Sequence, residues 1–241
     1  MTVLRTRRKW FAPAATVLLI FTLSACTKQS TPSINDREDE VVSNDSSQNV
    51  PQIVFFGDSI TAGYGLRSKD EAFPAIIQKR LDDEGFSYEV INAGESGETS
   101  SGGLRRVEWI MSRSPDAEIF VLELGGNDGL RGIPTELTKR NLSEIIDKVR
   151  SAKPGITIIV AGMQIPSNMG SDYVRKFAAI FPDVAREKNA ELIPFVLKDV
   201  GGIRSLNQVD GIHPTSDGHK IIAKTVWETL GKTLKSELVA N

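Results

Sequence analysis

The stretch QIVFFGDSITAGY, residues 52–64, is the first example of a pattern that recurs along the sequence from residue 51 onward. A short apolar run comes first, and a polar turn that contains glycine follows it directly. The run is continuously apolar instead of alternating with polar residues, which is typical of a parallel strand covered on both faces. We therefore predict a buried strand over 52–56, with Asp58 and Ser59 just beyond its carboxyl end.

Short apolar runs and longer amphipathic stretches alternate along the remaining sequence. Strands are predicted at 52–56, 88–92, 118–124, 157–161 and 191–195, and helices near 71–84, 101–112, 134–151, 171–188 and 216–236. Alternation of this kind implies right-handed crossovers between parallel strands. We predict a single α/β domain over residues 51–241, with a doubly wound, mainly parallel five-stranded sheet in a three-layer α/β/α arrangement.

The composition excludes several classes of function. The chain has 29 Lys and Arg residues against 31 Asp and Glu, and no basic block outside the extreme N-terminus, so we expect no nucleic-acid partner. One cysteine cannot form an internal disulfide, and one cysteine with two histidines argues against a Cys/His metal site. The chemistry must then come from oxygen nucleophiles, carboxylates, amides and imidazoles.

The first 26 residues have the features of an export signal. Four cations precede an apolar run over 14–23, which is too short to span a bilayer as a mature helix. The run ends in Leu23-Ser24-Ala25-Cys26, which resembles the lipobox of bacterial lipoproteins, where the cysteine is diacylated and becomes the new N-terminus. We predict a lipoprotein signal peptide over 1–25 and lipidation of Cys26. The alternative is an ordinary signal peptide with a chance cysteine.

The residues after Cys26 are predicted to form a tether. Residues 27–50 are rich in Ser, Thr, Asn, Gln and Asp and show no sustained apolar period. A flexible coil of this length spans about 25–30 Å on average. With the lipidated cysteine, 26–50 would hold the domain at the periplasmic or extracellular face of a bacterial membrane.

Polar groups follow three predicted strands, at the edge where parallel sheets bind ligands. Ser59 follows the first strand, Gly97 lies in the turn after the second, and Asn127 follows the third. A serine hydroxyl can act as a nucleophile, while a glycine N–H and an asparagine amide can donate hydrogen bonds to an oxyanion. Each residue alone also fits an ordinary role, as a helix cap or part of a turn.

A second polar group, Asp210-Gly211-Ile212-His213-Pro214, precedes the last predicted helix. An aspartate three residues before a histidine can curl back to the imidazole and fix its tautomer. The alternative is a surface turn with an incidental histidine. His219, the other histidine, has no matching acid upstream, and we expect it to face solvent on the last helix.

Taken together and in order, these blocks resemble the SGNH (GDSL-type) hydrolase family, specifically its bacterial thioesterase I, lysophospholipase L1 or arylesterase branch. The matching blocks are Gly57-Asp58-Ser59, Ser96-Gly97-Glu98-Thr99, Gly125-Gly126-Asn127-Asp128 and Asp210-Gly211-Ile212-His213-Pro214. Residues 123–132 and 163–166 are also similar to that branch, and the resemblance covers roughly 52–230. Ile60 replaces the usual leucine of the first block, a change that we expect to be silent.

The resemblance implies a flavodoxin-like fold and a serine esterase. Ser59 would be the nucleophile, His213 the general base and acid, and Asp210 the residue that orients His213. The backbone N–H groups of Ser59 and Gly97 and the side chain of Asn127 would form the oxyanion hole. The reaction would need no metal or organic cofactor.

The expected substrate is a small-molecule or lipid carboxylic ester, such as a lysophospholipid or a short- to medium-chain ester, since export argues against cytosolic acyl-CoA. We expect segments 94–103 and 164–173 to border the acyl-binding cleft, and the protein to be a monomer. Two alternatives are an extracytoplasmic carbohydrate acetylesterase and a non-catalytic tethered binding lipoprotein.

Overall fold

The computed structural model describes residues 50–240, with side chains as far as Ser236. The expected signal peptide, Cys26 and all of the tether except Val50 lie outside the described residues. No helix within 50–240 combines the length and the apolar character needed to cross a membrane.

Five parallel strands form the central sheet, in the spatial order β2-β1-β3-β4-β5. Their bounds are β1 Gln52–Gly57, β2 Glu89–Gly94, β3 Ala117–Glu123, β4 Thr157–Ala161 and β5 Glu191–Ile193. The chain moves from β1 outward to β2 and then returns to the other side of β1 as β3. This reversal of strand order makes a topological switch point between β1 and β3, where open α/β sheets form their ligand crevice.

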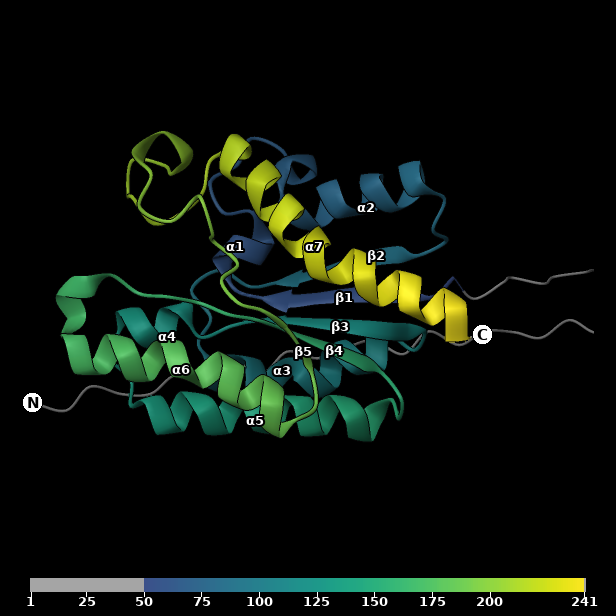
Figure 1. Cartoon of the computed structure of the whole chain (residues 1–241), viewed down its shortest axis with the longest axis horizontal. Helices are drawn as coiled ribbons and strands as arrows, with labels where there is room; N and C mark the ends of the chain where they lie inside the picture. Colours follow the sequence, from purple (N-terminus) through teal and green to yellow (C-terminus); the bar gives the residue numbers. More distant parts are fainter. Residues whose placement is uncertain (1–49, 241) are drawn as a thin grey trace, which may run out of the picture. The chain divides into compact units, whose positions relative to one another are not determined.

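Helices cover both faces of the sheet (Figure 1). One face carries α2 (Phe73–Glu84) and α7 (Ser216–Ala240), and the other carries α3 (Ser100–Arg113), α5 (Thr135–Ala152) and α6 (Ser171–Glu187). The predicted three-layer α/β/α class is confirmed. Two short helices that we did not predict, α1 (Ser59–Ala62) and α4 (Gly126–Leu130), directly follow β1 and the loop after β3.

Aromatic side chains fill the core on both faces of the central strands. Phe55 packs edge-on against Phe73 of α2, and Phe56 lies 5.3 Å between ring centroids from Phe120 of β3. All four are fully buried, which explains why β1 is apolar over 53–56 and β3 over 119–122. On the second face, α3 approaches the sheet at Gly103, where an added Cβ would lie 2.4 Å from Cδ1 of Leu124.

The predicted boundaries shift for four of the five strands, since β1 ends at Gly57 instead of residue 56 and β3 lies at Ala117–Glu123 instead of 118–124. β2 lies at Glu89–Gly94 instead of 88–92. β5 ends at Ile193 instead of residue 195, because Pro194 follows and a proline has no N–H for the strand ladder. Short 3₁₀ helices lie at Lys69–Glu71, Ser167–Met169 and Arg204–Leu206.

His219 does not face solvent, so that prediction was wrong. Its side chain is 1% exposed and stacks on the ring of Phe73, and its Nδ1 accepts a hydrogen bond of 3.2 Å from the Phe73 backbone N–H. The accepting Nδ1 must be unprotonated, and burial lowers the pKa of His219 to about 4. No acid upstream was needed, because a backbone donor at the start of α2 satisfies the imidazole.

Candidate active site

Ser59 opens the short helix α1 directly beyond the carboxyl end of β1. Asp58 caps this helix, since its Oδ1 accepts a hydrogen bond of 3.0 Å from the N–H of Ile60. The turn is tight: a Cβ added at Gly57 would lie 2.0 Å from Oγ1 of Thr61. The sequence therefore places the Ser59 hydroxyl at the strand end, on a residue that is 7% exposed.

His213 reaches Ser59 from a loop 154 residues away in sequence. Its Nε2 lies 2.9 Å from Oγ of Ser59, and its Nδ1 lies 2.6 Å from Oδ2 of Asp210. A carboxylate can only accept hydrogen bonds, so Nδ1 carries a proton and Nε2 is left to accept from the serine. In a neutral imidazole, this arrangement puts the unprotonated Nε2 beside the hydroxyl.

The Asp210 carboxylate is held by its own loop. Its Oδ1 accepts hydrogen bonds from the backbone N–H groups of Ile212 and His213, at 2.9 and 3.0 Å. The hydrogen bond to the His213 ring, followed by these backbone bonds, lowers the pKa of Asp210 to about 2. Asp210 is thus an anion at any ordinary working pH, as an orienting group for an imidazole must be.

Asn127 lies on α4, across the switch point from Ser59. Its Nδ2 donates a hydrogen bond of 3.1 Å to Oδ2 of Asp58, so one carboxylate links the helix of Ser59 with the helix of Asn127. Within residues 50–240, the second N–H of this amide has no acceptor and remains available to a ligand. Asn127 and Ser59 line the same cavity.

Gly97 lies in the turn between β2 and α3 with φ at +79°, a left-handed conformation that favours glycine. Its carbonyl accepts a hydrogen bond of 3.0 Å from Nη2 of Arg131, just after α4. No hydrogen bond in the described part of the chain uses the N–H of Gly97. Arg131 thus holds the carbonyl of Gly97, and the N–H of Gly97 stays open.

A cavity of about 450 Å³ extends from Ser59 and His213 along the carboxyl edge of the sheet. Its apolar lining is formed by Ile60, Leu130, Met163, Ile165, Pro166, Phe195, Leu197 and Ile212. Residues 164–166 belong to a segment that we expected at the cleft. No residue of the other expected segment, 94–103, is among the lining residues of this cavity.

The match to a protein-family model decides the family. The model of the GDSL-like lipase/acylhydrolase family matches residues 55–221. This chain belongs to that family. The match includes Ser59, Gly97, Asn127, Asp210 and His213, so all five predicted site residues lie within the part shared with other GDSL-type hydrolases.

Individual relatives and solved structures are consistent with the match to the family model. The chain is 39% identical over 178 residues to the esterase TesA of Pseudomonas aeruginosa, covering 74% of this chain and 87% of that protein. It is 34% identical over 171 residues to thioesterase 1/protease 1/lysophospholipase L1 of Escherichia coli K12, covering 71% and 79%. Among solved structures, the psychrotrophic esterase EstA from Pseudoalteromonas sp., inhibited by monoethylphosphonate, superposes with a TM-score of 0.71 at 32% identity, covering 76% and 98%.

Sequence reasoning missed the buried acids that support this GDSL-type site. Asp128, next to Asn127, accepts hydrogen bonds from the backbone and hydroxyl of Ser100 and from Oγ1 of Thr138, so it ties α4 to α3 and α5. Glu123, at the end of β3, accepts a bond of 2.7 Å from Oγ1 of Thr61. The available signal for Glu123 was a charged residue between the apolar run 119–122 and Leu124.

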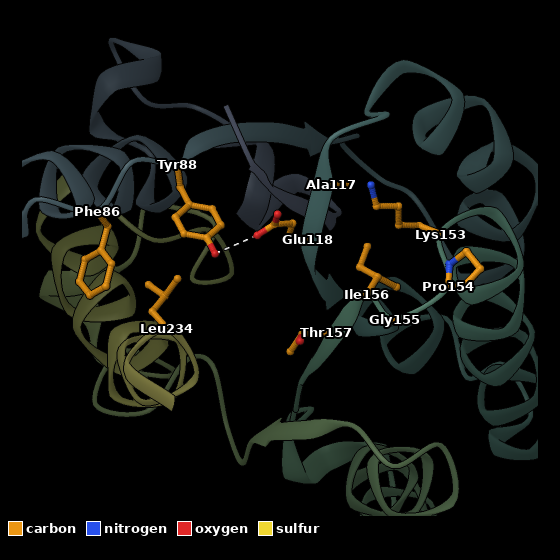
Figure 2. A pocket seen from close by; sticks show the side chains of 10 residues that line it. All are labelled: Phe86, Tyr88, Ala117, Glu118, Lys153, Pro154, Gly155, Ile156, Thr157 and Leu234. Carbon is orange, nitrogen blue, oxygen red and sulfur yellow. Dashed lines mark hydrogen bonds between the residues drawn. The ribbon is translucent and has the colours of Figure 1, made fainter. Parts of the chain in front are cut away.

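A second cavity, of about 370 Å³, lies at the amino edge of the sheet, where β3 and β4 begin (Figure 2). Tyr88 and Glu118 meet there through a hydrogen bond of 3.0 Å, and Lys153 donates to the carbonyl of Pro115. None of the site residues lines this cavity. Ser59, Asn127 and His213 line the other cavity, at the opposite, carboxyl edge of the sheet.

Proposed function

We propose that this chain hydrolyses carboxylic esters through an acyl-enzyme formed on Ser59. One observation carries the proposal: Ser59, His213 and Asp210 form a continuous hydrogen-bonded relay at the mouth of a mainly apolar cavity. The names of the relatives, esterase and thioesterase/lysophospholipase, support an acyl ester or thioester as the substrate class.

The reaction begins when Nε2 of His213 takes the Ser59 proton and Oγ attacks the ester carbonyl. Negative charge then develops on the carbonyl oxygen, where the proposed donors at Ser59, Gly97 and Asn127 would stabilise it. A single donor of this kind typically contributes about 2.7–4 kcal/mol to stabilising the transition state. The protonated His213, stabilised by ionised Asp210, passes its proton to the leaving alcohol or thiol, and water repeats the sequence on the acyl-enzyme.

The cavity supports a preference for acyl groups with an alkyl chain. Its lining is mainly apolar, with Gln164 and Asn207 as polar residues away from Ser59, so burial of each methylene of a substrate would contribute up to about 0.8 kcal/mol. We therefore propose lysophospholipids or medium-chain esters as the natural class, with small aryl esters as convenient substrates.

The experiment is hydrolysis of p-nitrophenyl esters from acetate to palmitate by the chain and its Ser59→Ala variant. We expect a rate maximum at a medium chain length in the wild type and no activity above background in the variant. Activity restricted to acetate would favour the carbohydrate acetylesterase. A folded protein that is inactive on every ester would favour the non-catalytic binding lipoprotein.

We also propose that the protein is exported and anchored through lipidated Cys26. The support is the basic segment, the apolar run and the single cysteine at the position that a lipobox requires. Two or three acyl chains on one residue would give stable membrane attachment. In a bacterial host, the wild type should sediment with membranes, while Cys26→Ser should lose the lipid mass and the attachment. Recovery of unprocessed wild type in the cytosol would contradict this proposal.

A further inference from the structure

Two carboxyl groups lie buried beneath Ser59, and the reaction steps above use neither. Asp58 is 2% exposed and Glu123 is 1% exposed. Asp58 precedes the nucleophile, and Glu123 contacts Thr61 of the same short helix. Burying even one isolated carboxylate costs several kcal/mol, so a buried pair in this position calls for a physical explanation.

Each oxygen of Asp58 has a donor from a different element. Oδ1 accepts from the backbone N–H of Ile60 in α1, and Oδ2 accepts from the Asn127 amide in α4. The chain also passes closely over this carboxylate, since a Cβ added at Gly126 would lie 3.3 Å from Oδ2. Asp58 is therefore an acceptor with a fixed geometry between the two helices of the site.

Ionised Asp58 can only accept hydrogen bonds, and it therefore determines the orientation of the Asn127 amide. Facing an anion, the amide must present its NH₂ group, with one hydrogen on Asp58 and the other directed elsewhere. If a group at position 58 could donate, the amide could turn over and place its carbonyl oxygen there. That oxygen would repel a developing oxyanion instead of stabilising it.

The surroundings of Glu123 favour its neutral form. Oε2 accepts from Thr61, but Oε1 is buried without a hydrogen-bond partner among the described residues. Burial, and then the charge of Asp58, raise the pKa of Glu123 well above its usual range, although hydrogen bonds from Thr61 and from the backbone of Asp58 oppose the rise. Burial also raises the pKa of Asp58, to about 6, although its hydrogen bonds and His213 oppose the rise. Between the two carboxyls, Asp58 therefore keeps the charge at neutral pH.

We propose that ionised Asp58 is a positioning residue that holds the Asn127 amide with its donor side toward the reacting carbonyl, while Glu123 carries a proton so that Asp58 can remain an anion. The role given to Asn127 rests on the proposed function. Glu98 and His213 are the other titratable groups that act on Asp58, and Glu98 is paired with Arg106 through two hydrogen bonds.

The test compares two isosteric substitutions in the full chain, Asp58→Asn and Glu123→Gln. Asp58→Asn introduces a donor opposite Asn127, so kcat should fall about 10²–10³-fold, the cost of losing one oxyanion donor, with KM changed less than about threefold. Glu123→Gln keeps a neutral side chain of the same shape, so its loss in kcat should be at least tenfold smaller. Equal losses in the two variants, or an Asp58→Asn enzyme with wild-type kcat, would overturn the proposal.

A double-mutant cycle with Asn127→Ala separates positioning from general damage. If Asp58 acts through Asn127, then Asp58→Asn should cost less than about fivefold in kcat once Asn127 is already alanine. Multiplicative losses would show that Asp58 acts independently and would refute the proposal. These comparisons use only the Ser59-dependent rate, so absence of any such rate would count against the proposed function instead.

Infrared spectroscopy tests the proton on Glu123 without using activity and without requiring Asp58→Asn to fold. The wild type at neutral pH should show the C=O stretching band of a protonated carboxylic acid, and Glu123→Gln should lack it. A wild type without this band, or a band that persists in Glu123→Gln, would contradict the assignment of the proton.

Discussion

Asp210 shows most clearly how single residues build this site. It fixes the tautomer of His213 through one oxygen and its own loop through the other. Asp210→Asn would allow the imidazole to take the other tautomer, so kcat should fall about 10²–10⁴-fold. The side chain is 39% exposed, so the midpoint of thermal unfolding should hardly change. Steady-state kinetics with a short ester and a melting curve check both expectations, and an active Asp210→Asn enzyme would contradict the first.

For single residues, prediction from the sequence succeeded where the local sequence pattern was distinctive. Ser59 directly follows an apolar run, and the three-residue spacing of Asp210 and His213 suits a loop that curls back on itself. The structure brings these three together, and it puts Asn127 and Ser59 on one cavity. The sequence did not predict that Asp58 would bond to Asn127, because that contact joins residues 69 positions apart and depends on the angle between two helices that we did not foresee.

At the scale of elements, His219 gives the packing of α7 on α2 a pH dependence. Its folded-state pKa of about 4 lies below the ordinary value of 6.5, so the unfolded chain binds a proton that the folded chain does not. The free energy of unfolding should therefore decrease as the pH falls from about 6.5 toward 4, by about 2–3 kcal/mol from this group.

The measurement is urea unfolding of the wild type and His219→Asn at pH 7 and pH 4.5. Oδ1 of asparagine can replace Nδ1 as the acceptor for Phe73, and asparagine does not titrate. The variant should lose about 2–3 kcal/mol less stability than the wild type over this interval. An identical loss in the two proteins would mean that His219 binds protons equally well in the folded and unfolded states.

The contact of α3 with the sheet gives a second prediction about elements. Gly103→Ala would place a methyl group 2.4 Å from Leu124 and 3.0 Å from Phe56, both in the core. Relief of this overlap should cost about 1–3 kcal/mol in the free energy of unfolding. Ser112→Ala, at an exposed position of the same helix, serves as the control and should change stability by less than about 0.5 kcal/mol. Equal urea midpoints for the two variants would show that the helix shifts at no cost.

Strands and short helices differ in how well their positions can be predicted from the sequence, and the difference has physical reasons. All five strands were predicted, the central β1, β3 and β4 because buried parallel strands have apolar cores, and four of the five shifted only at their ends. The short helices α1 and α4 escaped prediction because four or five residues are too few to show a periodic pattern. His219 was misplaced because its acceptor role depends on a backbone N–H 146 positions away.

At the scale of the whole molecule, the cleft and the start of the domain lie at opposite edges of the sheet. β1 begins at Gln52 at the amino edge, while Ser59 follows its carboxyl end. If Cys26 is anchored as proposed, residues 27–50 must provide the reach for the cleft to meet a lipid in the same membrane. Deletion of residues 30–45 should leave hydrolysis of a soluble ester unchanged within about twofold but reduce hydrolysis of membrane lysophospholipid. Equal rates for both proteins on both substrates would argue against a membrane substrate.

The central claim, that Ser59 activated by His213 is the nucleophile, is tested most directly by covalent labelling. A reactive alkyl phosphonate should add one phosphonyl group per chain, on the peptide that contains Ser59, and ester hydrolysis should fall in proportion to the labelled fraction. Ser59→Ala should take up no label, and His213→Ala should react at least about 100-fold more slowly. Stoichiometric labelling at a different residue, or full ester hydrolysis by Ser59→Ala, would contradict the account.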